Sequence, residues 1–499
     1  MEATKSVPAR EQLNLRVIGH AIDQMPTTRP LLTVIIIAAL ASLFDNMDSK
    51  LLGFALPGIA KEFGLEPQKM GLIASSTMIG MMVGSFLWGW IADKWGRRMA
   101  FTMTVLIFSI FSGMTAACFS IGFLLGVRFV TGVGLGGAIP VDAAILAEFS
   151  PARIRGFAGG VLPIAFPVGT FIASWAALLI VPHFGWRMLF IVGVIPALLT
   201  AWVRRGVPES PRWLANRGRF AECRKALNHI GVTDEAIDRS ALALANEPPP
   251  PRLPKPLFRD LFVPEMRRRT AHTWIVWGLP AMASWGMTLW MPSFFVKLHG
   301  TDLKQALAYT FYISIVAIAG RLTSYFFLDR AGRKPFTILG YLGAGSFLLL
   351  LTTIHHNGSA FAWGAAGYMY FIEMGMCAIT PYTPEVYPLH IRVLGTSTAM
   401  GVGRIGGATG PYIIGLLMGI GKVPWIWIVL GAGCLIAGLA TIWLGIETRG
   451  RNLEQLNPVA AERAAAMSRR NDALDLAAAA TITIAEQVPE TTKNRGGHI

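Results

Sequence analysis

The chain has 499 residues, of which 53% are hydrophobic and 15% are charged. Soluble domains are about 45–50% apolar and about 25% charged, so this sequence has too few polar residues to cover a water-exposed surface. The composition therefore excludes an ordinary soluble protein and predicts a polytopic helical membrane protein. The net charge of +15 does not indicate nucleic-acid binding, because the basic residues lie mostly between apolar runs, where they orient a membrane protein.

Cysteine spacing and the N-terminal residues exclude several further classes. The four cysteines, Cys118, Cys223, Cys377 and Cys434, are widely spaced and form no CxxC pair. We therefore expect neither a disulfide framework nor a metal site. The first thirty residues have basic side chains but no apolar core followed by a cleavage site, so we expect no cleaved signal peptide.

Apolar runs of about 18–25 residues, the length that crosses a bilayer, follow one another in two groups. The first six predicted spans are 31–57, 70–92, 99–119, 122–147, 157–181 and 187–203. The second six are 271–296, 304–328, 336–354, 361–386, 394–417 and 424–445. The sequence thus predicts an all-α protein with twelve transmembrane helices.

The interval 204–269 separates the two groups and carries fourteen Lys/Arg residues and the segment NEPPPPRLPKP. Loops rich in Lys and Arg stay in the cytoplasm, so this linker and both termini are predicted to be cytoplasmic. The predicted domains are a segment at 1–30, a six-helix bundle at 31–203, the linker at 204–269, a six-helix bundle at 270–446 and a tail at 447–499. We expect a multi-pass protein of the plasma membrane, most simply a bacterial inner membrane.

The two halves repeat each other. GSFLWGWIADKWGRR at 84–98 matches GRLTSYFFLDRAGRK at 320–334, an offset of 320 − 84 = 236 residues. AEFSPARIRG at 147–156 matches PEVYPLHIRV at 384–393, an offset of 384 − 147 = 237 residues. Two motifs at nearly constant separation predict two pseudo-symmetric bundles, an arrangement common among secondary transporters, with the substrate site at mid-membrane between the halves.

GWIADKWGRR resembles the loop motif of the major facilitator superfamily, and DRAGRK resembles its second copy. PESPRWL at 208–214 and ETRGRNLEQL at 447–456 resemble segments of the sugar-porter and organic-anion-porter branches. The resemblance covers roughly residues 30–456 and implies the major facilitator fold. We interpret PESPRWL as a structural or regulatory element, and GxxxxGK[ST] does not occur, so ATP-driven transport is not expected.

We expect the repeated motifs to join neighbouring helix ends through ion pairs that can form and break during transport. A carboxylate at a helix end can meet a guanidinium or the N-terminus of an adjoining helix, and a glycine there permits close helix packing. We therefore assign gating roles to Gly89, Asp93, Arg97, Arg98, Glu148, Arg155, Asp329, Arg333, Lys334, Glu385 and Arg392. Gly89 is expected to let a neighbouring helix approach, and the pairs Glu148 with Arg155 and Glu385 with Arg392 are expected to complete the charge network.

Charges inside predicted spans are functional candidates, because each costs about 2.5–3.5 kcal/mol to insert. Asp45 and Asp48 share a face of the first span, about fourteen residues or ~21 Å from its inner end. The fourth span starts at the outer surface, and Arg128 lies about six residues, or ~9 Å, from this start. Asp45, Asp48 and Arg128 are therefore expected at nearly the same depth in the membrane. Asp45 or Asp48 is expected to pair with Arg128, and Asp142 is a second proton-relay candidate. Fixed ion pairs that hold helices together remain the alternative.

Other side chains at mid-depth are candidates for substrate contact. Glu373 and Arg404 lie near the middle of the tenth and eleventh spans, and the planar guanidinium of Arg404 matches a carboxylate. Trp285, Trp290 and Tyr382 are expected to contact a ring-bearing substrate, with a packing role as the alternative. Lys50 is expected near the outer boundary of the membrane, where its amine can reach water.

Asp45-x-x-Asp48, followed by GFALPGIAKEFGL, resembles the DGxD signature of the aromatic-acid:proton symporters, and GVRFVTGVGLGGAIPV resembles their fourth span. Asn46 replaces the signature glycine, and Lys50 and Asp142 have no counterpart in the pattern. The resemblance implies a secondary active transporter that takes up a small organic acid with protons. It implies no cofactor besides the proton gradient, and we expect a monomer in the lipid bilayer.

Three alternatives remain open. A proton-antiporting exporter and a sugar-type uniporter would share the fold, whereas a non-transporting membrane sensor would use the linker to contact a partner. An enzyme is not expected, because the sequence holds no nucleophile–base or metal-ligand constellation.

Overall fold

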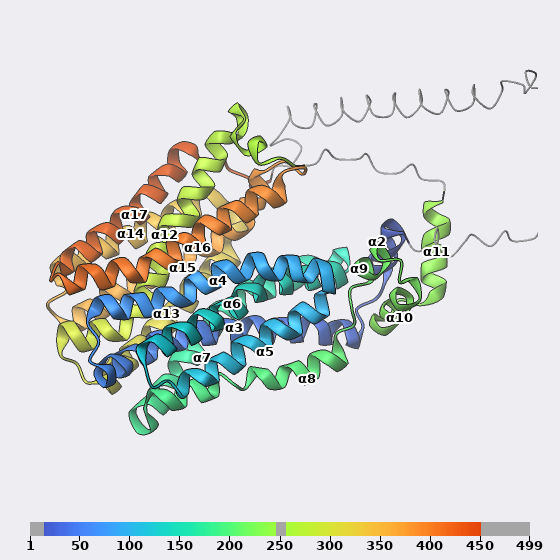
Figure 1. Cartoon of the computed structure of the whole chain (residues 1–499). Coiled ribbons are helices and arrows are strands. Elements are labelled where there is room, and N and C mark those ends of the chain that lie inside the picture. Colours follow the sequence, from blue (N-terminus) through green and yellow to red (C-terminus); the bar gives the residue numbers. More distant parts are fainter. Residues whose placement is uncertain (1–13, 246–255, 451–499) are drawn as a thin grey trace, which may run out of the picture.

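A computed structural model describes residues 14–245 and 256–450, and the regular elements of these residues are helices. Figure 1 shows them in two groups of long helices, with shorter helices at one end. The first group is α3 (Arg29–Phe63), α4 (Pro67–Trp95), α5 (Arg97–Ala116), α6 (Ile121–Phe149), α7 (Ala152–Val192) and α8 (Pro196–Gly206). The second is α12 (Pro264–His299), α13 (Leu303–Ala331), α14 (Arg333–Ile354), α15 (Gly358–Val386), α16 (Arg392–Gly419) and α17 (Val423–Leu444). The shorter elements are α2 (Leu15–Gln24), α9 (Pro211–Asn216), α10 (Phe220–Ile230), α11 (Asp234–Leu244) and the 3-10 helix η1 (Phe258–Phe262).

Each of the twelve predicted spans lies on these long helices, and the sixth is the least regular. α7 continues past the predicted fifth span and is kinked at Gly185, whose φ of 78° is left-handed. The helix stops at Val192 and resumes as α8 at Pro196, so the sixth span consists of the end of α7 and the whole of α8. A proline at the first position of α8 suits the new start, since its missing N–H would have no partner there.

Eight helical stretches in the described part of the chain combine the length and hydropathy of a membrane span, and one of them, 164–203, covers most of the predicted fifth span and all of the sixth. α12, α15 and α16 fall outside this set. They carry buried or half-buried polar groups, among them His272, Glu373 and Arg404. Their lower hydropathy is consistent with helices that line a polar interior rather than lipid.

The loop-motif glycines form the turns between consecutive helices. Gly96 joins α4 to α5 with a φ of 108°, and Gly332 joins α13 to α14 with a φ of 102°. Residues with a side chain rarely adopt this left-handed conformation, so glycine is required at both positions. The same turn in both halves agrees with the sequence repeat.

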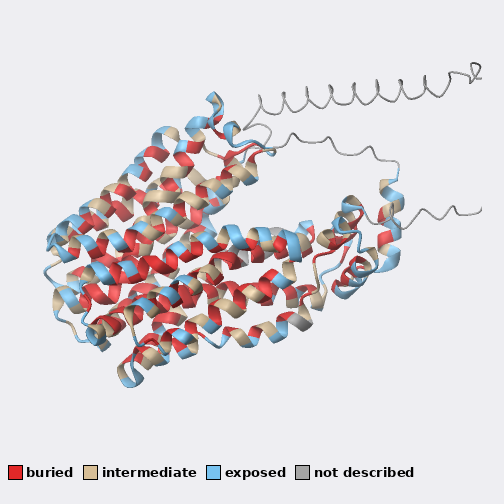
Figure 2. Ribbon diagram, in the orientation of Figure 1, coloured by how far each residue is buried: buried red, intermediate tan, exposed pale blue. Residues whose placement is uncertain are grey.

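Within each group the helices pack closely. In the first, α4 packs along α6 and α3 along α7; in the second, α12 packs along α16, and α14 along α15 and α17. The two groups meet where α4 contacts α16, α7 contacts α13 and α3 contacts α12. Figure 2 shows buried residues facing the interior of both groups and exposed ones at the connections. The domain limits at 31–203 and 270–446 remain predictions from the repeat.

Small residues permit the closest helix contact, but Gly89 is not among them. A Cβ on Gly84 would collide with the backbone carbonyl of Val133, which places α4 directly against the backbone of α6. A Cβ on Gly89 would meet nothing within 4 Å. The expectation that Gly89 admits a neighbouring helix is therefore wrong for this structure, and the close approach occurs one and a half turns earlier in α4.

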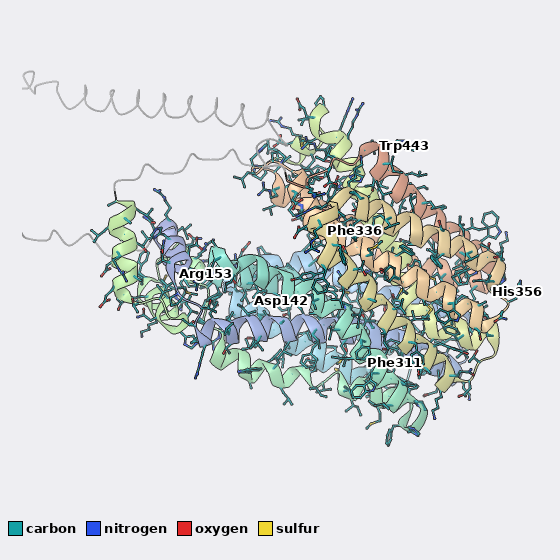
Figure 3. The ribbon with its side chains drawn as sticks, turned by 180° about the vertical axis from the view of Figure 1, so that it is seen from behind. Asp142, Arg153, Phe311, Phe336, His356 and Trp443 are labelled. Atoms are coloured by element: carbon teal, nitrogen blue, oxygen red, sulfur yellow. The ribbon has the colours of Figure 1, made fainter. Side chains whose placement is uncertain are left out.

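The short helices mark one end of the molecule, which we call the motif end because Asp93 and Asp329 also lie there. In α9, the Trp213 indole N–H donates to the carbonyl of Asp93 (2.9 Å). The backbone N–H of Ala152, at the start of α7, donates to Asp23 of α2 (2.7 Å). Figure 3 shows Arg153 near these helices and His356 at the other end, which we call the opposite end.

Candidate functional site

A cavity of about 430 Å³ lies between the two groups of helices. α3, α4, α6 and α7 line it from the first group, and α12, α13, α15 and α16 from the second. Its lining is mostly apolar, with four charged side chains: Lys50, Arg321, Glu373 and Arg404. Three aromatic side chains, Phe166, Trp277 and Trp285, also line the cavity, as does the amide of Asn46. A predominantly apolar lining with a few converging polar groups is typical of small-molecule sites. We call it the central cavity.

The central cavity is closed at the opposite end by direct helix contacts. A Cβ on Gly53 in α3 would lie 2.9 Å from the backbone of Leu289 in α12, so the two helices touch there. The hydroxyls of Ser174 in α7 and Ser314 in α13 are hydrogen-bonded at 3.0 Å. α4 and α16 touch where a Cβ on Gly71 would meet the carbonyl of Pro411 at 2.7 Å.

Towards the motif end the lining continues along the same helices. It includes Leu146 and Ala147 near the end of α6, Thr380 near the end of α15, and Met400 in the first turns of α16. Helix contacts thus close one end of the cavity while its lining extends towards the other. This asymmetry is what alternating access requires of one state of its cycle.

The cationic side chains of the cavity differ in their partners. Arg321 pairs with Glu373 at 2.6 Å, so these two charges compensate each other. The Lys50 amine sits 3.4 Å from the ring centroid of Trp285, a cation–π contact between α3 and α12. Arg404 donates from Nη1 to the carbonyl of Met81 in α4 at 3.0 Å, again across the two groups. Lys50 is 7% exposed, so the expectation that it reaches the outer boundary is wrong.

Asp48 and Arg128 form an ion pair at 3.6 Å (Oδ2 to Nη1), and both side chains are completely buried. The Ser112 hydroxyl also donates to Asp48, and Arg128 Nε donates to the hydroxyl of Thr77 at 3.2 Å. Phe190 covers the guanidinium at 5.5 Å. The helix break that begins at Gly193 lies beside this pair, because a Cβ there would be 2.9 Å from Asp48 Oδ1.

Asp45 and Asp142 are buried without an ion pair among the described residues. The Ser42 hydroxyl donates to Asp142, whose other oxygen has no hydrogen-bond partner in the described part of the chain. Asp45 Oδ1 is also without a hydrogen-bond partner there. Figure 3 shows Asp142 inside the first group, away from both ends.

At the motif end the repeated arginines each join two carboxylates. Arg97 contacts Asp93 at 2.6 Å and Glu148 at 3.4 Å, which ties α5 to α4 and α6. In the second group, Arg333 contacts Asp329 at 2.8 Å and Glu385 at 3.3 Å. The geometry therefore assembles six of the predicted gating residues into two equivalent clusters.

Comparison with known proteins decides the family. Residues 34–460 match the family model described as "Sugar (and other) transporter". The chain belongs to this transporter family, and thus to the major facilitator superfamily. Its members are membrane transporters rather than enzymes, as the sequence predicted.

The transporter is similar to curated and solved proteins over most of its length. It is 29% identical over 454 residues to the niacin transporter of Acinetobacter baylyi, covering 87% of this chain and 98% of the relative. It is 29% identical over 410 residues to the cis,cis-muconate transport protein of the same organism, covering 81% and 91%. The inward-open structure of the xylose transporter of E. coli superposes with a TM-score of 0.68 at 18% identity, covering 86% of this chain and 99% of that one. This confirms the predicted twelve-helix fold.

Two predicted substrate contacts of the transporter lie elsewhere. Trp290 is fully buried against the second group, where its indole N–H donates to the Pro411 carbonyl at 3.0 Å. Tyr382 is buried near the motif end, where its hydroxyl accepts from the N–H of Ile446 at 3.0 Å. Neither belongs to the cavity lining, so both predictions of substrate contact are wrong. Trp285, Glu373 and Arg404 do line the cavity.

The transporter's gating network also differs from the expected pairs. Arg392 donates from Nε to the Tyr387 carbonyl at 3.4 Å, so the expected pair with Glu385 is wrong in this structure. Glu385 instead accepts from the Thr448 hydroxyl at 2.5 Å. Lys334 donates from Nζ to two carbonyls at the end of α17. The backbone N–H of Arg98 donates to Glu209. The side chain of Arg155 lies outside the described residues, so its expected pair with Glu148 remains a prediction.

Two carboxylates that we did not predict cap the N-termini of α5 and α14 in the transporter. Glu209 of PESPRWL accepts from the backbone N–H groups of Arg97 (2.7 Å) and Arg98 (3.2 Å). Glu447 of ETRGR accepts likewise from the N–H groups of Arg333 (3.1 Å) and Lys334 (3.2 Å). A carboxylate at a helix N-terminus satisfies free N–H groups and the helix dipole. The repeat offset pointed to them, because 447 − 209 = 238 follows the 236 and 237 of the other motifs.

Proposed function

We propose that this transporter takes up a small organic acid carrying a ring or conjugated chain, together with protons, by alternating access. The observation that carries the proposal is the charge of the central cavity. Three basic side chains, Lys50, Arg321 and Arg404, face a single acidic one, Glu373. Since Arg321 and Glu373 neutralise each other, two cations remain for an anionic substrate.

The apolar part of the lining supports the same substrate class. Trp277, Trp285 and Phe166 offer flat faces to a ring. A ring that stacks on Trp285 would take the position of the Lys50 amine, and the displaced amine would be free to meet the substrate carboxylate. Two of the similar proteins are a niacin transporter and a cis,cis-muconate transport protein, and both of their substrates are acids of this type.

Proton coupling follows from the buried carboxylates. Asp45 is buried and has no ion pair among the described residues, so no cation of the protein compensates its charge directly when it is ionised. Protonation of Asp45 removes a buried negative charge from the helix that also carries the cavity residues Asn46 and Lys50, so proton and anionic substrate bind more strongly together than either alone. Asp142 lies on the motif-end side and can receive the proton next, whereas Asp48 and Arg128 compensate each other as a fixed pair.

Orientation completes the proposal. The linker and both loop motifs are rich in Lys and Arg, which favours the cytoplasmic side for the motif end. The central cavity would then face the cytoplasm in this conformation. The proton gradient is the driving force, and no cofactor takes part.

The test is uptake of labelled nicotinate or benzoate into proteoliposomes under an inward proton gradient. Arg404→Gln is expected to lower kcat/KM about tenfold or more, because a hydrogen bond to a charged group contributes about 1.5–3 kcal/mol. Arg224→Gln, in an exposed pair with Asp234 on the linker helices, is the matched control and should leave uptake unchanged.

Asp45→Asn should abolish gradient-driven uptake while retaining exchange of substrate between the two sides. Uptake that persists after the gradient is collapsed would show a uniporter instead. Accumulation only in vesicles of inverted orientation would show an exporter, and no flux with this protein alone would favour a sensor.

A further inference from the structure

A second cavity of about 410 Å³ lies at the opposite end, between the outer parts of α3 and α12 and the start of α13. Its lining includes Lys61 of α3 and Lys297 of α12, with Asp302 and Thr301 at the connection to α13. Nothing in the transport mechanism above uses these residues.

The second cavity is in line with the central cavity along the same two helices. On α3 the order is Lys50 in the central cavity, Gly53 at the helix contact, and Lys61 in the second cavity. On α12 the corresponding order is Trp285, Leu289 and Lys297. Lys50 and Lys61 are eleven residues apart, about 16 Å along a helix, so a barrier of a few turns separates the two cavities.

Both helices have a proline at this barrier. Pro57 of α3 cannot donate to the carbonyl of Gly53, and Pro292 of α12 cannot donate to that of Thr288. The helix segments beyond the Gly53–Leu289 contact are therefore joined to the rest by one fewer hydrogen bond each. Such sites are where long helices bend, so the contact can open without unfolding either helix.

Three polar side chains of the second cavity, Lys61, Lys297 and Ser293, have no partner in the described part of the chain. Lys61 and Lys297 are exposed, and neither forms an ion pair within residues 14–245 and 256–450. Asp302 caps α13 by accepting from the N–H of Lys304 at 3.1 Å. The Ser293 hydroxyl is fully buried and has no hydrogen-bond partner among the described residues. A buried hydroxyl without a partner is costly unless a ligand or water satisfies it.

We propose that the second cavity is an antechamber that binds the carboxylate of an incoming organic acid before the Gly53–Leu289 contact opens. Lys61 and Lys297 supply the positive charge, and Ser293 donates a hydrogen bond to a carboxylate oxygen. The site rests on the proposed function for its place on the transport path, but its binding of carboxylates can be measured without transport.

The test uses purified full-length protein with Thr301→Cys as a reporter in the cavity lining; the four native cysteines are buried. Benzoate should slow the reaction of this cysteine with an anionic methanethiosulfonate. Lys61→Gln with Lys297→Gln should remove this protection and lower the reaction rate of the anionic reagent about fivefold per lysine, since a charge at 4 Å in water contributes about 1 kcal/mol. Lys304→Gln, at the same end but outside the lining, is the matched control and should change both much less.

Arg404→Gln separates this site from the central one, and protection should persist in that variant. Protection that is absent in the parent, unchanged in the double lysine variant, or lost with Arg404→Gln would overturn the antechamber while leaving the proposed function intact. If benzoate protects the cysteine but this protein transports no organic acid in proteoliposomes, the proposed function is refuted and the carboxylate site is retained. Val296→Cys gives the same readout from α12 if Thr301→Cys does not fold.

Discussion

Asp48→Asn should destabilise the protein and Asp45→Asn should not, although the two residues lie one helical turn apart. Asp48 is paired with Arg128 at 3.6 Å with both side chains fully buried, so the substitution leaves a buried guanidinium without an anion. Removing one partner of a buried pair costs about 3–5 kcal/mol. Asparagine keeps an oxygen that can accept from Ser112, so we expect about 3 kcal/mol, the lower end of that range.

Asp45 has no ion pair among the described residues, and one of its oxygens lacks a hydrogen bond there. Its neutral replacement removes no buried pair, so Asp45→Asn should leave the unfolding temperature unchanged or raise it. The assay is thermal unfolding of purified protein, followed by tryptophan fluorescence, with proton-driven uptake measured on the same samples.

The double variant Asp48→Asn/Arg128→Gln provides the control. It removes both charges, so it should recover a large part of the stability that Asp48→Asn loses, and the cycle measures the coupling directly. Equal destabilisation by Asp45→Asn and Asp48→Asn would refute the assignment of Asp48 as the fixed partner and Asp45 as the free carboxylate.

Three further predictions concern the helix ends, the helix contacts and the linker. Glu209→Ala removes the acceptor for two N–H groups at the start of α5 and should lower the unfolding free energy by about 1–2 kcal/mol, whereas the exposed Glu222→Ala should change the unfolding temperature little. Gly84→Leu should abolish the folded peak in size-exclusion chromatography because its side chain meets the α6 backbone, while Gly89→Ala should behave like the parent; similar losses for both would contradict the packing. Burial raises the pKa of the Cys223 thiol to about 11. Alkylation of Cys223, mapped by mass spectrometry, should therefore be slow at pH 7 and still increase above pH 9. A plateau of the alkylation rate near pH 9 would show that the linker helices do not cover this thiol.

The sequence by itself determined what lies along each helix axis. The apolar runs gave the number and order of the spans, and the repeated glycines marked turns that the structure forms with left-handed φ at Gly96 and Gly332. The depth of each residue followed from its distance to a span end, because a helix rises a fixed 1.5 Å per residue. The helical rise was therefore sufficient to predict that Arg128 lies at the same membrane depth as Asp45 and Asp48 of α3.

Tertiary structure decided the direction in which each side chain points around its helix. Asp45 and Asp48 have similar depth, but only Asp48 contacts Arg128. Trp285 and Trp290 are five residues apart, about 140° around the helix, and only Trp285 faces the central cavity. Lys50 likewise faces the cavity rather than the membrane boundary. Lipid and protein interior are both apolar, so hydrophobic periodicity does not distinguish the two faces of a membrane helix, and only its packing against other helices fixes its rotation.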